Sequence, residues 1–225
     1  MKKCIISFAD KEILAKMEEL GFECIEVVKS ACVSGPISAH SDVLYQKLNN
    51  SVIIASACQR GNFGYLAASG YTVIECENLK PGYTTESLLN FIINNEYIIY
   101  NPKTALNVNR DLKRIEVKQG YTKCSTVCVN SGAYITDDES IYKILTENKI
   151  DCLKIEKGDI RLDGYNYGFI GGASVKLNDK EILFFGDIKN KKDKASVVNF
   201  LNKYGMKAIF IENKKMTDIG SALIL

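Results

Sequence analysis

The feature that most constrains the fold of this chain is a pattern of apolar hairpins repeated along the sequence. Short polar turns join paired apolar segments, and the four hairpins cover residues 43–56, 87–100, 124–136 and 174–185. Apolar runs separated by Asn, Asp or Gly are typical of antiparallel β-hairpins. The turns begin at residues 49, 94, 131 and 178, and this regular recurrence indicates structural repeats.

A helix and a third strand follow the later hairpins. Residues 138–149 and 192–204 carry apolar side chains at helical spacing, and each predicted helix precedes an apolar segment, at residues 151–155 and 207–211. The complete unit is therefore strand, strand, helix, strand.

The two earlier hairpins fit the same unit less regularly. The Gly-containing residues 60–70 and the apolar residues 71–75 predict an irregular helix and a strand after the first hairpin. After the second hairpin, Pro102 and the short length of residues 102–112 predict a turn or a stub of helix before a strand at residues 114–118.

The chain ends supply the parts of a fifth unit. Residues 3–8, 10–20 and 23–28 predict strand, helix and strand without an opening strand, and residues 220–225 predict a lone strand. Pairing of the first eight residues with the last six would remove exposed sheet edges. We predict one domain over residues 1–225, an α/β propeller of five units with pseudo-fivefold symmetry, closed by these terminal strands.

Composition excludes several classes of protein. Hydrophobic residues make up 46% and charged residues 25% of the chain, which is typical of a globular protein. The net charge of +2 gives no reason to expect nucleic-acid binding. No apolar run approaches the ~18 residues of a membrane span, and no signal peptide is evident, so we expect a soluble, cytoplasmic protein.

The eight cysteines fit this compartment. Five of them lie inside apolar, strand-like runs, where thiols pack as small hydrophobes: Cys4, Cys24, Cys76, Cys128 and Cys152. Because their spacing shows no short-chain disulfide pattern, we predict that all eight cysteines are reduced.

Two motifs carry a resemblance to a known superfamily. His40-Ser41-Asp42 is similar to the His-x-Asp motif of arginine deiminases and amidinotransferases, and residues 171–178, Gly-Gly-Ala-Ser-Val-Lys-Leu-Asn, resemble their Glu-Gly-Gly-Asp strand. The chain thus resembles the pentein, or guanidino-group-modifying-enzyme, superfamily, and most closely its uncharacterised, mainly clostridial members. The resemblance implies a fold of five units, with the His as acid or base and the Asp as the anchor of a guanidinium group.

The chain departs from those enzymes at three positions. Ile170 stands where they carry a catalytic Glu, and Ala173 stands where they carry the following Asp. Their nucleophilic Cys lies on the opening strand of the last unit, but the matching residues 218–225, with Ser221 among them, contain no Cys. The order of the motifs around the ring also differs. Arginine deiminase activity is therefore disfavoured.

The candidate site consists of polar residues at the start of each unit, where the opening strands line the axis of a propeller. His40, the only histidine, is the candidate general acid or base, with Asp42 two residues on along the same strand face. Cys124 is the candidate nucleophile, and the adjacent Lys123 would favour its thiolate, although neighbouring strand residues point to opposite faces. The predicted substrate-binding residues are Glu86, Lys123, Ser174, Asp218 and Ser221.

Structural alternatives exist for both reactive residues. A lone His before a strand is commonly a capping or surface residue, and Cys124 can be a buried structural thiol like Cys128. These two cysteines lie roughly 13 Å apart along a strand, at ~3.3 Å per residue, so they do not form a metal pair. We predict no metal and no cofactor.

Two functions remain. The first is a hydrolase or transferase acting on a small polar, guanidino- or amide-like molecule at the propeller axis, with His40, Asp42 and Cys124 as catalytic residues. The second is a non-catalytic binding module, because the same superfamily contains the ribosomal anti-association initiation factor. We expect a small-molecule ligand at the propeller axis and neither nucleic acid nor a membrane as a partner, whereas a sealed axis would favour the binding module.

Overall fold

Small sheets dominate the fold. The computed structural model describes residues 2–7, 10–108 and 111–225, and within them the strands form five three-stranded sheets. In spatial order the sheets are β15 (Ala222–Ile224), β1 (Lys2–Ile6) and β2 (Phe22–Glu26); β3 (Tyr45–Lys47), β4 (Val52–Ser56) and β5 (Thr72–Cys76); β6 (Ile92–Ile93), β7 (Tyr97–Tyr100) and β8 (Lys113–Glu116); β9 (Thr126–Asn130), β10 (Ala133–Thr136) and β11 (Asp151–Lys154); and β12 (Ser174–Asn178), β13 (Glu181–Phe184) and β14 (Lys207–Phe210).

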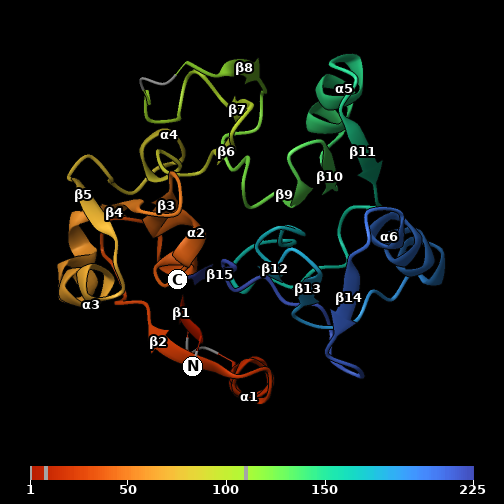
Figure 1. Ribbon diagram of the computed structural model, residues 1–225, viewed down its shortest axis with the longest axis horizontal. Coiled ribbons are helices and arrows are strands. Elements are labelled where there is room, and N and C mark those ends of the chain that lie inside the picture. Colours follow the sequence, from red (N-terminus) through yellow and green to blue (C-terminus); the bar gives the residue numbers. More distant parts are fainter. Residues whose placement is uncertain (1, 8–9, 109–110) are drawn as a thin grey trace.

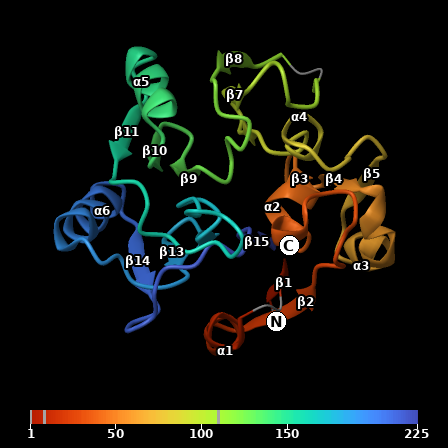
Figure 2. The ribbon, with the colours of Figure 1, turned by 180° about the vertical axis from the view of Figure 1, so that it is seen from behind.

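All five sheets share one topology. The middle strand pairs antiparallel with the opening strand and parallel with the third strand. A hairpin makes the first pairing in the four internal sheets, and the four predicted hairpins are confirmed. Figure 1 and Figure 2 show the five units following one another around a common centre.

Helices fill the parallel crossovers of four units. They are α1 (Lys11–Glu19), α3 (Phe63–Ala68) after the 3-10 helix η2 (Ala57–Asn62), α5 (Glu139–Glu147) and α6 (Lys191–Lys203). Asp138 caps α5 by accepting hydrogen bonds from two backbone N–H groups of the first turn, and Asn190 caps α6 in the same way. The predicted helices at 138–149 and 192–204 are thus confirmed, as is the irregular helix after the first hairpin.

The third unit lacks a crossover helix within the described residues. The chain turns at residues 102–104, directly after Asn101, and enters β8 at Lys113. The predicted turn is therefore confirmed up to residue 108, and residues 109 and 110 of the predicted segment lie outside the described residues.

The chain ends meet in the first sheet. β1 pairs antiparallel with β15, with Cys4 opposite Ile224 and Ile6 opposite Ala222, and it pairs parallel with β2. The predicted pairing of the terminal strands is observed for these residues, whereas Met1 and Phe8 lie outside the described residues. Residues from both ends of the sequence thus complete one sheet.

The apolar core lies between neighbouring units. One cluster joins Ile6 and Met17 of the first unit to Leu183 and Phe185 of the fifth. Comparable clusters join the first and second units, the second and third, the third and fourth, and the fourth and fifth. Each unit therefore buries its apolar surface against two neighbours. No helix among the described residues is long and apolar enough to cross a membrane.

One disulfide corrects the prediction that all eight cysteines are reduced. Cys32 and Cys58 are bonded, and the other six cysteines are free. The prediction was drawn from the strand-like positions of five cysteines, which do lie in strands or at their ends. Cys32 and Cys58 lie outside the strands, in a turn and in η2, and it is the tertiary fold that brings these two segments together.

Candidate functional site

Most of the predicted site residues lie in turns that precede the opening strands, and Ser174 is the first residue of β12. His40 comes before the one-turn helix α2 (Ser41–Leu44), and Glu86 ends the one-turn helix α4 (Tyr83–Glu86). Cys124 lies in a turn closed by a hydrogen bond from Ser125 N to Tyr121 O. The prediction that His40 and Asp42 share a strand face and that Cys124 opens a strand was wrong, because the chain makes a further turn before it enters each sheet.

Hydrogen bonds join the five turns in a closed circuit. Each bond links turns of two different units, so the position of every turn depends on its neighbours. The bonds run from Asp42 N to Gly220 O, Ser221 N to Gly172 O, Gly172 N to Cys124 O, Cys124 N to Asn90 Oδ1 and Asn90 Nδ2 to Asp42 O, with lengths between 2.8 and 3.1 Å. The candidate site residues therefore lie on or next to turns whose positions are fixed by hydrogen bonds to one another.

Close approach of these turns requires glycine at two positions. A Cβ atom on Gly172 would lie 2.1 Å from Asp218 Oδ1, and one on Gly220 would lie 2.3 Å from His40 Cβ. Gly220 also has a φ of +77°, in the left-handed region that favours glycine. The absence of side chains here lets Asp218 and His40 pack directly against these two turns.

Asn90 was missed by sequence reasoning. Its amide oxygen accepts hydrogen bonds from Lys123 N and Cys124 N, and its amide nitrogen donates to Asp42 O and to Cys124 Sγ, the last at 2.8 Å. The sequence signal for Asn90 was a single amide within the otherwise apolar run of residues 88–93. The structure shows that this amide is fully buried. A buried amide must be hydrogen-bonded, and here its partners are the candidate site.

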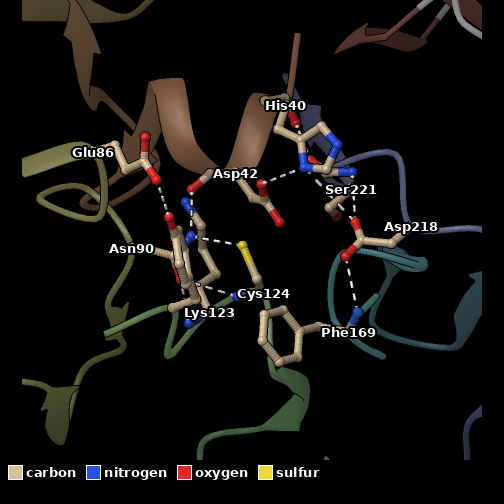
Figure 3. Close-up of polar contacts among 12 residues, drawn as sticks. His40, Asp42, Glu86, Asn90, Lys123, Cys124, Phe169, Asp218 and Ser221 are labelled. Carbon is tan, nitrogen blue, oxygen red and sulfur yellow. Dashed lines mark hydrogen bonds and ion pairs between the residues drawn. The ribbon is translucent and has the colours of Figure 1, made fainter. Parts of the chain in front are cut away.

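A cavity of about 430 Å³ gathers His40, Cys124 and Asp218. We call it the aromatic cavity, because Tyr83, Tyr121, Tyr165, Tyr167 and Phe169 line it as well. Figure 3 shows the His40 ring between the carboxylates of Asp42 and Asp218, with the Cys124 sulfur nearby. His40 Nδ1 lies 3.9 Å from Asp42 Oδ1 and 3.8 Å from Asp218 Oδ1.

Two buried carboxylates flank His40 and differ in their partners. Asp218 accepts hydrogen bonds from Phe169 N and Gly220 N, at 2.9 and 3.0 Å. Burial, reinforced by the negative charge of Asp42 and opposed by His40, raises the pKa of Asp218 to about 6. Within the described part of the chain, neither carboxylate oxygen of Asp42 accepts a hydrogen bond from an N–H or O–H group.

The Cys124 thiol holds its proton in the free protein. Burial raises its pKa well above the usual value, and the charges of Asp42 and Asp218 and contact with the Asp42 carboxylate raise it further. Lys123 opposes this shift, as the sequence suggested, but does not outweigh it. The sulfur is therefore a neutral thiol at neutral pH.

Lys123, Asp42, Ser174 and Ser221 line a different cavity. This cavity of about 650 Å³ is bordered by hairpin residues such as Asn50 and Ser131, and we call it the hairpin cavity. Lys123 Nζ donates to Tyr45 O and Gln46 Oε1, at 2.7 and 3.0 Å, and burial lowers its pKa to about 8. The serine hydroxyls donate to backbone carbonyls, of Ile170 for Ser174 and of Ser174 for Ser221.

Glu86 lines neither cavity. Its carboxylate accepts hydrogen bonds from Ser34 N, Ser34 Oγ and Gly82 N, and from the Tyr121 hydroxyl at 2.5 Å. Burial alone would raise the pKa of Glu86, but these hydrogen bonds outweigh it and lower that pKa. Glu86 thus holds Tyr121 in the wall of the aromatic cavity.

Comparisons with known proteins identify a matching sequence family and solved structures of similar fold. A sequence model described as "Family of unknown function (DUF6873)" matches residues 5–223. No curated protein matches the chain. Among solved structures, a dimethylarginine dimethylaminohydrolase from Pseudomonas aeruginosa in complex with citrulline aligns with a TM-score of 0.57 at 8% identity, covering 100% of this chain and 99% of that one.

Two amidinotransferases are also similar. One, an inosamine-phosphate amidinotransferase from Streptomyces griseus, has a TM-score of 0.53 at 10% identity, covering 94% of this chain and 77% of that one. The other, from the saxitoxin biosynthetic pathway of Microseira wollei, has a TM-score of 0.55 at 11% identity, covering 89% and 73%. The chain has the fold of the pentein superfamily of guanidino-modifying enzymes.

Proposed function

The chain belongs to the family of unknown function DUF6873, and we propose that it is an enzyme acting on a small molecule with a guanidino or amidino group. The observation that carries this proposal is the aromatic cavity, in which His40, Cys124 and Asp218 meet beside Asp42, a buried carboxylate that accepts no N–H or O–H hydrogen bond among the described residues. A nucleophile, a proton carrier and two carboxylates are the groups that a cationic electrophile requires.

The proposal takes the five sheets to form a closed propeller whose axis passes between the two cavities. The pairing of β1 with β15 supports this, as does the closed circuit of hydrogen bonds among the five turns. Six free thiols among the eight cysteines support the cytoplasm as the compartment, and the Cys32–Cys58 disulfide opposes it.

Binding of a planar cation would change the state of Cys124. A guanidinium ion bound next to Asp218 in the aromatic cavity would offset part of the negative charge that raises the thiol pKa, so the substrate itself would favour the thiolate. In this mechanism the thiol becomes reactive only when the site is occupied.

The reaction then proceeds in two displacements. His40 accepts the thiol proton, the Cys124 sulfur bonds to the amidino carbon, and the bond from that carbon to the departing nitrogen breaks as His40 returns the proton to the amine. Water in a hydrolase, or an acceptor amine in a transferase, next adds to the carbon and loses a proton to His40. The carbon–sulfur bond breaks and the thiol takes that proton back.

A binding module without chemistry is the second candidate, and the protonated, buried state of Cys124 in the free protein favours it.

The two functions predict different outcomes when the protein is incubated with alkylguanidines and 4-guanidino acids. An enzyme releases amine, and mass spectrometry detects a covalent adduct on Cys124.

Matched variants make this experiment decisive. Cys124→Ser is expected to abolish turnover while ligands still bind, and Cys128→Ser, which changes a thiol on the following strand, is expected to retain turnover. His40→Asn should lower turnover by about 100-fold or more, the contribution of a general acid–base. Binding without product in the wild-type protein, or unchanged turnover in Cys124→Ser, would overturn the enzymatic proposal.

A further inference from the structure

The residues that line the aromatic cavity also indicate the chemistry of the substrate's tail, the part of the molecule away from its reacting group. We infer that the substrate is an organic cation whose tail is uncharged and apolar, and that the site rejects compounds carrying a carboxylate next to that tail. This inference rests on the proposed function, because it describes the other end of the molecule that Cys124 would attack.

The first observation is the charge of the lining. Among the described residues, no Lys or Arg lines the aromatic cavity, and the one carboxylate in its lining is that of Asp218. A carboxylate placed in the cavity would lose hydration without gaining an ion pair, and it would face the negative charge of Asp218. The cavity therefore opposes an anionic tail.

The second observation is that the tyrosines present their rings. The Tyr83 hydroxyl accepts a hydrogen bond from Gly120 N, and the Tyr121 hydroxyl donates to Glu86. Tyr83, Tyr121 and Phe169 form a continuous wall, with ring centroids 5.5 Å apart for the first pair and 6.3 Å for the second. Ring faces bind apolar groups and cations, and they offer no donor to an anion.

The third observation concerns the mouth of the cavity. Tyr83 and Tyr165 are each 47% exposed, and both line the cavity. Large aromatic side chains left in water at the edge of a cavity are typical of a binding surface. An apolar tail that covers these rings would gain hydrophobic free energy in the same step that places its cationic end near Asp218.

The nearest cation that contacts the wall is Lys157. Its Nζ lies 4.9 Å from the centroid of the Tyr167 ring and 5.8 Å from that of Phe169, but the residue does not line the cavity. Lys157 is itself exposed to solvent, so its charge lies at the outer side of the wall and not within the cavity lining.

Three guanidines that differ at the tail test the inference. Isothermal titration calorimetry on Cys124→Ser, which blocks chemistry, would compare 4-guanidinobutanoate with its methyl ester and with butylguanidine. We expect the ester and butylguanidine to bind at least tenfold more tightly than the acid. Equal or tighter binding of the acid would overturn the inference and leave the proposed function standing, whereas no binding of any of the three would overturn both.

Two further variants locate the selectivity. Asn166→Arg places a cation at an exposed lining position, and it should raise the affinity for the acid while leaving that for butylguanidine within a factor of two. Lys157→Ala should change neither affinity. Loss of acid binding in Lys157→Ala would show that this lysine recognises a carboxylate, and would also overturn the inference. Thermal melts of both variants confirm that they are folded.

Discussion

The thiol of Cys124 is held in its protonated form by burial and by two neighbouring carboxylates. Burial has the largest effect on its pKa, and the carboxylates of Asp42 and Asp218 raise it further because a thiolate would be a third negative charge in the same space. Asn90 donates a hydrogen bond to the sulfur and remains available to stabilise a thiolate. The sulfur therefore lies next to the other candidate catalytic groups, but it is a neutral thiol and not the nucleophilic thiolate.

Removing one of these negative charges should make Cys124 more reactive. In Asp42→Asn the pKa of the thiol falls, and each unit of that fall gives about tenfold more thiolate at pH 7.5. The rate of iodoacetamide labelling, measured by peptide mass spectrometry, should rise accordingly. Cys128 is the internal control, because burial raises its pKa to about 11 and Asp42 does not contribute to that shift. Equal labelling of Cys124 in both proteins would contradict this account.

Asp137 makes the stability of the protein depend on pH. It is buried, both of its carboxylate oxygens lack a hydrogen-bond partner among the described residues, and burial raises its pKa to about 7. Because the folded state holds this proton more tightly than the unfolded state, Asp137 contributes stability at low pH. That contribution is lost as the pH rises from about 4 through 7.

Asp137→Asn should accordingly stabilise the protein at pH 8.5 and have little effect at pH 4.5. We expect a gain on the order of 2 kcal/mol in the free energy of unfolding at the higher pH, less than the full shift implies, because the buried amide also lacks partners. Urea unfolding at both pH values measures it. Asp179→Asn, at a side chain that is 98% exposed, is the control and should change neither value. A destabilisation at pH 8.5 would contradict the assignment.

At the scale of elements, the hairpins and helices follow from local sequence, whereas the turns at the axis do not. Residues such as Asn94 and Asp138 specify a turn or a helix start through hydrogen bonds to their own neighbours, which a sequence displays. The turn at Cys124 is instead braced by Gly172 N and Asn90 Oδ1, from two other units. These partners are distant in sequence, so the segments before β3 and β9 were predicted as strand.

An added methyl group in the turn before β12 should lower both stability and ligand binding. In Gly172→Ala the new Cβ would overlap the Asp218 carboxylate, so either Asp218 or the turn must move. We expect a loss of about 2 to 4 kcal/mol in stability and a large loss of ligand affinity, because Asp218 lines the aromatic cavity.

The matched control is Gly64→Ala. Gly64 lies in α3, and a Cβ atom there would meet nothing within 4 Å. Alanine has the higher helix propensity, so this variant should keep or slightly raise stability. Thermal unfolding and calorimetric titration of both variants check the prediction, and similar effects of the two substitutions would show that close approach at Gly172 is unimportant.

At the scale of the whole molecule, the repeats predicted the number of sheets, and the missing opening strand predicted how the chain ends pair. The division of the predicted site residues between two cavities was not predictable, because it depends on which way each turn faces. Asp42 and His40 are two residues apart, yet they line different cavities. The disulfide between Cys32 and Cys58 was missed for a similar reason, since only the tertiary fold joins the segments that carry them.

The junction of the two chain ends should stabilise the entire molecule. Deleting residues 220–225 removes β15, exposes an edge of β1, and breaks the circuit at Asp42 N, which donates to Gly220 O, and at Gly172 O, which accepts from Ser221 N. Because every unit packs against two neighbours, the deletion should destabilise all five units and not only the chain end.

The deletion should lower the midpoint of thermal unfolding by at least about 10 °C, since 1 kcal/mol corresponds to about 2 to 4 °C for a chain of this size. It should also increase hydrogen exchange in the fourth unit, at β10 and α5, which lies far from the cut in sequence. Deletion of Leu225 alone is the control, because it keeps β15 and removes one backbone hydrogen bond, to Lys3 O. An unchanged midpoint in the longer deletion, or faster exchange limited to β1 and β2, would mean that the units are held independently and that the terminal strands do not stabilise the ring.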